Sequence, residues 1–123
     1  NINLRDIPEL WNQEYKRLFA KEVDKDSNGC LQDVHWYAGL FGYFPTYSLG
    51  ALTAAQIASQ VREDIKNLDQ QIEKGNFDEL INWLKLNIHS KASLYSTNEI
   101  LQQVTNSELN AKYFMDYIKN RYL

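Results

Sequence analysis

The sequence is poor in cysteine, proline and glycine, and each shortage excludes a class of fold. Cys30 is the only cysteine, which excludes an intrachain disulfide and a cysteine-rich zinc module and favours a reducing compartment, by default the cytoplasm. Two prolines and five glycines are too few for the frequent turns of a small β-sandwich. We therefore expect the 123 residues to form one all-α, compact multi-helix domain, a single helical unit over residues 1–123.

The sequence also lacks an excess of positive charge and a long apolar run. Thirteen Lys and Arg against sixteen Asp and Glu give a net charge of −3, so a nucleic-acid partner is not expected. The longest uncharged stretch is interrupted by Gly39, Gly42 and Pro45, which argues against a membrane-spanning helix. No P-loop, G-x-G-x-x-G or G-x-S-x-G pattern occurs, so phosphate cradles and hydrolase elbows have no support.

Apolar residues that recur every three or four positions, together with N-cap residues, predict several helices. Asp6 with Glu9 and Ser96 with Glu99 have the spacing of capping boxes, and Gly75 suits the left-handed end of a helix. The expected helices cover residues 7–23, 68–74 and 97–104, with one more after Asn76 through Ile88 and a last one after Asn110.

Residues 34–61 contain no Asp, Glu, Lys or Arg. We interpret this stretch as a buried central hairpin of helices with a bend at Phe44, which precedes a proline. Gln32, Asp33 and His35 border it, and burial would oblige them to find polar partners. From residue types alone Asp33 could equally cap a helix, and His35 could bond a backbone carbonyl.

Metal ligands and nucleophiles are scarce. Asp24, Asp26, Asn28 and Gly29 spell the start of an EF-hand loop, but its twelfth position is His35, where calcium needs a glutamate. A polar connector fits the same residues. The chain has two histidines, fifty-four positions apart, so it contains no H-E-x-x-H motif. Cys30 could pair with His35 as nucleophile and base, although a partly buried thiol is more often inert.

The segment Gly29 to Trp36, G-C-L-Q-D-V-H-W, resembles the G-x-x-Q-D-x-H-W signature of the carboxypeptidase Taq family of metallocarboxypeptidases. Phe41 to Gly50 and the following Ala54-Ala55-Gln56 are similar to the family's F-G-Y-F-P-T-Y-x-L-G and A-A-Q blocks. A looser likeness extends to the end of the chain. The resemblance implies the C-terminal portion of a larger, mostly helical zincin-like metallopeptidase, cut from a longer protein before Asn1.

The resemblance also implies what the whole enzyme does. Family members are usually homodimers that remove amino acids from the C-termini of peptides, with zinc or another divalent metal held by an H-E-x-x-H helix and a downstream Glu. Because these ligands are absent here, we expect this fragment to bind no metal and to be inactive by itself.

By the same resemblance, five residues would line one wall of the active site. His35 and Tyr47 would be catalytic, as donors to the oxyanion of the transition state. Gln32 would bond the substrate backbone, Asp33 would fix the tautomer of an imidazole, and Tyr43 would meet the substrate's terminal carboxylate.

The alternative is a non-catalytic helical protein-interaction module. Such a module would bind its partner through an exposed aromatic surface, made up of Trp36, Tyr37, Phe41 and Tyr43.

Overall fold

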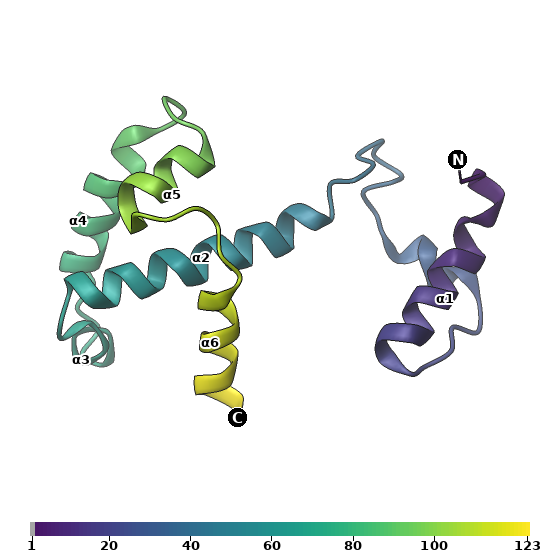
Figure 1. The fold of residues 1–123 in the computed structure, drawn as a ribbon, viewed down its shortest axis with the longest axis horizontal. Helices are drawn as coiled ribbons and strands as arrows, with labels where there is room; N and C mark the ends of the chain where they lie inside the picture. The colour runs from purple at the N-terminus through teal and green to yellow at the C-terminus, as the bar shows by residue number, and fades with distance from the viewer. Residues whose placement is uncertain (1) are drawn as a thin grey trace. The chain divides into compact units, whose positions relative to one another are not determined.

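The computed structural model describes residues 2–123 and contains helices and turns, with no strand in that range. The predicted all-α class is therefore confirmed. Contacts divide the chain into two compact units, Asn1–Pro45 and Thr46–Leu123, and each is described by itself (Figure 1). The single helical unit over residues 1–123 stays a prediction.

The first unit is built on α1, Ile7–Phe19, which a short 3₁₀ helix, η1 at Leu4–Asp6, extends at its start. The Asn3 side chain caps η1 by accepting a hydrogen bond from the Arg5 N–H at 3.0 Å. Asp6 makes no side-chain cap bond, so the predicted capping box at Asp6 and Glu9 is wrong, because the added turn moves the helix start upstream. The helix ends at Ala20, whose φ is +53°.

Two further 3₁₀ turns complete the regular structure of the first unit: η2, Asp26–Asn28, and η3, Cys30–Gln32. The side chain of Cys30 is 2% exposed. Trp11 of α1 meets Trp36 edge-on, with ring centroids 6.3 Å apart, and Trp36 stacks on Phe41 at 6.2 Å. This aromatic cluster joins α1 to the signature segment.

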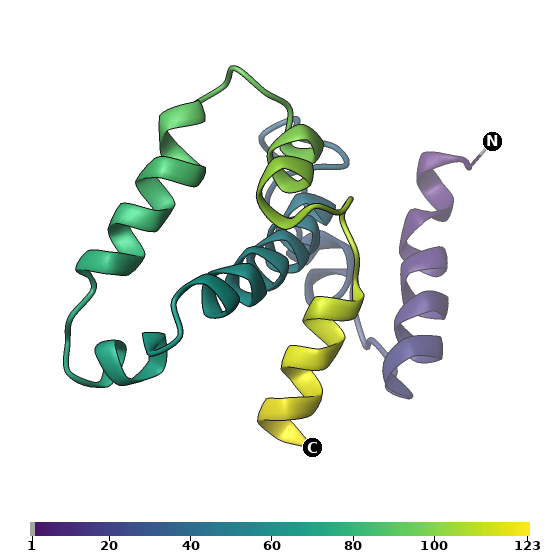
Figure 2. The same ribbon diagram turned by 60° about the vertical axis from the view of Figure 1, so that its left-hand side comes forward.

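The second unit packs several helices along one long helix. They are α2 (Pro45–Asp64), α3 (Leu68–Glu73), α4 (Asp78–Asn87), η4 (His89–Lys91), α5 (Thr97–Thr105) and α6 (Lys112–Tyr122), and Figure 2 shows them from a second side. The core consists of Val61, Ile65 and Leu68, against which Ile57, Leu80 and Trp83 pack. The Trp83 indole also donates to Asp64 at 2.7 Å, which ties α4 to the end of α2.

Local signals predicted several helix ends of this unit, although α4 begins at Asp78 with Phe77 as its N-cap and not directly after Asn76. Ser96 and Glu99 form a complete capping box at the start of α5, and the hydrogen bond from Ser96 holds the pKa of Glu99 below its ordinary value. Gly75, with φ of +72°, follows α3. The Asn110 side chain accepts a hydrogen bond from the N–H of Lys112, the first residue of α6, at 2.9 Å.

Gln56 of α2 is fully buried and holds the connection between α5 and α6. Its Nε2 lies 2.8 Å from Thr105 Oγ1, 2.9 Å from Ser107 Oγ and 3.1 Å from the Glu108 carbonyl. Its Oε1 accepts from the Asn110 N–H at 2.9 Å. One amide of α2 therefore satisfies backbone and side-chain groups in the connection between α5 and α6, and it fixes the start of α6.

The predicted buried hairpin over residues 34–61 is wrong. Residues up to Phe44 form turns and α2 is one continuous helix. Large side chains of the stretch are exposed: Tyr37 by 72%, Phe41 by 71% and Leu49 by 50%. Missing charge marks a surface that avoids water, whether the chain itself or another polypeptide covers it. Within residues 2–123 no helix is long and apolar enough to cross a bilayer.

Candidate functional site

Asp33 is 7% exposed at the end of η3 and binds His35 twice. Its Oδ1 accepts a hydrogen bond from the His35 backbone N–H at 3.0 Å and lies 2.6 Å from His35 Nδ1. A bond from an aspartate to the N–H two residues on closes an Asx turn, which aspartate forms readily. One carboxylate therefore shapes the turn and orients the imidazole.

The contact also fixes which ring nitrogen of His35 carries a hydrogen. An ionised carboxylate only accepts hydrogen bonds, so Nδ1 must carry a hydrogen. Nε2 is then an acceptor in the neutral ring and a donor in the doubly protonated ring.

Two aromatic rings from the following turn flank His35. The Tyr43 ring centroid lies 5.0 Å from that of the imidazole, and the Phe44 ring meets it edge-on at 5.6 Å. The turn doubles back because Gly39 and Gly42 adopt φ of +73° and +76°, values that glycine reaches without steric cost. Phe44 lies outside the predicted set of site residues, and its position before Pro45 in the same block is the signal that could have found it.

The structure brings Asp33, His35 and Tyr43 into one cluster within the first unit. Gln32 is exposed, and its amide donates to the backbone carbonyl of Ser27. Tyr47 belongs to the second unit, on the first turn of α2, with 59% of its surface exposed. The catalytic and binding roles of these five residues stay predictions.

Gly29, which opens the signature segment, lies where the chain packs tightly against α1. A Cβ added there would be 2.8 Å from Val23 Cγ1 and 3.3 Å from Asn12 Oδ1. Real Cβ atoms essentially never approach as closely as 2.8 Å, so a larger residue would force Val23 or the backbone at Gly29 to shift. The glycine is thus explained by packing, and it sets the position from which Asp33 and His35 follow.

The described residues do not fit a metal centre. Within residues 2–123, no group of three or more His, Cys, Asp or Glu could hold a metal ion. In the EF-hand-like loop, Asn28 donates to Asp24 Oδ1 at 2.9 Å, and η2 covers Asp26 to Asn28.

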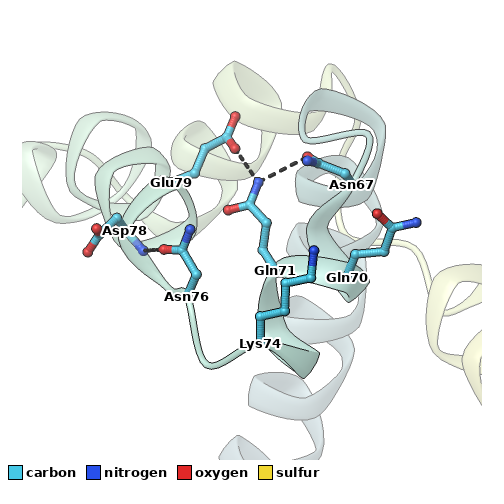
Figure 3. A pocket seen from close by; sticks show the side chains of 7 residues that line it. All are labelled: Asn67, Gln70, Gln71, Lys74, Asn76, Asp78 and Glu79. Atoms are coloured by element: carbon cyan, nitrogen blue, oxygen red, sulfur yellow. Dashed lines mark hydrogen bonds between the residues drawn. The ribbon is translucent and has the colours of Figure 1, made fainter.

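A polar pocket of about 380 Å³ lies between α3 and α4 and contains none of the predicted site residues. As Figure 3 shows, the Gln71 amide points between Asn67 and Glu79 and donates to both. Asn76 accepts from the Asp78 N–H at 3.2 Å. Because these groups satisfy one another, we read the pocket as a joint between two helices.

The chain belongs to the carboxypeptidase Taq (M32) metallopeptidase family, whose model matches residues 1–122.

Relatives agree along the whole chain. It is 38% identical over 122 residues to thermostable carboxypeptidase 1 of Pyrococcus furiosus, covering 99% of this chain and 24% of that protein. It is 38% identical over 121 residues to carboxypeptidase 1 of Bacillus subtilis, covering 98% and 24%. The chain thus spans about a quarter of the length of these relatives.

Solved structures agree as well. A Pyrococcus furiosus carboxypeptidase matches with a TM-score of 0.94 at 38% identity, covering 99% of this chain and 24% of that one. Trypanosoma cruzi metallocarboxypeptidase 1 matches with a TM-score of 0.92 at 39% identity, covering 99% and 25%.

Proposed function

We propose that this chain is the C-terminal part of a metal-dependent carboxypeptidase that hydrolyses the C-terminal peptide bond of peptides. It contributes a wall that binds substrate and stabilises the transition state, and another part of the polypeptide supplies the metal ligands. The observation that carries the proposal is the Asp33–His35 contact of 2.6 Å inside the family's signature segment.

His35 acts through Nε2. Asp33 occupies Nδ1, so a donor role toward the oxyanion of the transition state requires the doubly protonated ring. A positioned donor of this kind typically contributes a factor of about 10²–10³ in kcat. Asp33 is then a positioning residue: it acts through His35 and does not touch the substrate, unlike Gln32 and Tyr43.

The other residues have supporting roles. Tyr47 donates its phenol hydrogen to the same oxyanion. Tyr43, stacked near the imidazole at 5.0 Å, meets the terminal carboxylate of the substrate. Since the Gln32 amide nitrogen is engaged with the Ser27 carbonyl, its Oε1 is the atom that accepts a substrate N–H.

Within this proposal the whole enzyme uses zinc or another divalent metal and works as a homodimer in the cytoplasm. When bound, such a metal would supply Lewis-acid chemistry for polarising the scissile carbonyl and activating water. In this proposal every ligand of that metal lies outside residues 2–123. The isolated chain is accordingly inactive.

A hybrid enzyme tests the function. The matching quarter of Bacillus subtilis carboxypeptidase 1 is replaced by this chain, with which it shares 38% identity. With added Zn²⁺, the hybrid should release free C-terminal amino acids from peptides, and chain 1–123 by itself should release none. A hybrid that unfolds cooperatively on heating yet releases no amino acid would contradict the proposal.

The interaction-module alternative draws support from the exposure of Tyr37 and Phe41, 72% and 71%. It differs from the peptidase in one outcome. A module tolerates His35→Ala without loss of function, whereas the peptidase does not.

A further inference from the structure

An apolar groove runs along α1 in the first unit. It measures about 480 Å³, and apart from Glu14 its lining is wholly apolar: Ile2, Ile7, Leu10, Trp11, Tyr15, Leu18, Phe19 and Trp36. Several of these side chains are open to solvent, with Leu18 62% and Phe19 59% exposed. Covering such a surface is favourable by the hydrophobic effect.

The groove has the form of a seat for a helix. Its α1 residues recur at intervals of three and four, from Ile7 through Trp11 and Tyr15 to Leu18, so they form a stripe along one side of α1. From Ile7 to Leu18 there are eleven steps along the helix, which extend about 16 Å at 1.5 Å per step. A stripe of this length matches roughly three turns of a second helix that presents its own apolar ridge.

The charges at the groove do not call for a charged occupant. Glu14 is the one charged residue in the lining, and its carboxylate pairs with Arg17 at 2.7 Å. The pairing lowers any demand for a counter-charge from the occupant. An apolar ridge without a buried ion therefore fits best, since an unpaired buried charge is costly.

We infer that the α1 groove is the docking seat of an apolar helix from the remaining three quarters of the carboxypeptidase polypeptide. The missing length favours this occupant: this chain covers 24% of its relatives, so a body about three times its size is available to cover the groove. The inference rests on the proposed function in assuming that this polypeptide is present.

Cysteine protection in two contexts tests the inference. Leu18→Cys is made in chain 1–123 and in the hybrid with the Bacillus enzyme, and the rate of modification by a maleimide is followed at that site by peptide mass spectrometry. We expect modification to be at least about tenfold slower in the hybrid. Gln13→Cys is the matched control: it lies on the opposite side of α1 and should react at similar rates in both. Native Cys30 is 2% exposed and serves as an internal reference.

Each outcome decides the matter. Equal rates for Leu18→Cys in the two contexts overturn the inference. Protection in chain 1–123 that disappears on dilution identifies a second copy of this chain as the occupant, which also overturns it. If Leu18→Cys is protected in a folded hybrid that releases no amino acid, the docking seat stands and the proposed function fails.

Discussion

His35→Ala in the hybrid enzyme should lower kcat by about 10²–10³-fold, the usual effect of removing one oxyanion donor. KM should change far less, because the contact of Nε2 strengthens only in the transition state. The measurement is steady-state release of the C-terminal amino acid from a peptide series.

Asp33→Asn separates positioning from catalysis at the same site. The amide can still accept from Nδ1, but it no longer dictates the tautomer, so we expect kcat to fall by about 10–100-fold, as for partners behind a functional histidine. Asn28→Ala is a suitable control, because Asn28 bonds Asp24 in the neighbouring connector. For the first prediction, unchanged turnover in His35→Ala would remove His35 from the mechanism.

Gln56→Leu should cause the largest loss of stability in the second unit. The change keeps the volume but leaves the Glu108 carbonyl and the Asn110 N–H without their buried partner. Each orphaned group costs roughly 1–3 kcal/mol, so we expect a loss of about 3 kcal/mol and a fall in Tm of roughly 10–20 °C for a unit of this size. Thermal unfolding followed by circular dichroism measures it.

Gln60→Leu is the matched control for this change. Gln60 lies one helical turn further along α2, and its amide donates to Asp64 at the exposed surface, at 3.0 Å. Replacing it should alter stability by no more than about 0.5 kcal/mol. If Gln56→Leu were as mild as Gln60→Leu, the buried amide would not be what holds the start of α6.

The contrast between Ser96 and Gln56 indicates how far the sequence could predict the fold. Ser96, Glu99 and Gly75 act on backbone groups within a few residues, so their spacing alone predicts the ends of α3 and α5. Gln56 contacts residues 49 to 54 positions away, and no local pattern carries that information. The one local sign of this role is that Gln56 places an amide among the alanines of the uncharged part of α2.

The candidate site also combines local and distant contacts. The Asp33–His35 contact spans two residues, although residue types alone left a helix cap at Asp33 and a carbonyl partner for His35 equally open; the role of Asp33 stays a prediction. Residues 34–61 misled the interpretation because their lack of charge suggested burial within this chain, whereas Tyr37 and Phe41 are exposed. A segment that is covered by another stretch of polypeptide would lack charged residues in the same way.

The most direct test of the account is a crystal structure of the hybrid enzyme with a phosphinic peptide, whose tetrahedral oxygen mimics the oxyanion. We predict that His35 Nε2 and the Tyr47 hydroxyl both lie about 2.7–3.1 Å from that oxygen, with Asp33 still bonded to His35 Nδ1. An inhibitor bound in the cleft with both side chains turned away from its phosphinate would contradict the assignment of this chain as a catalytic wall.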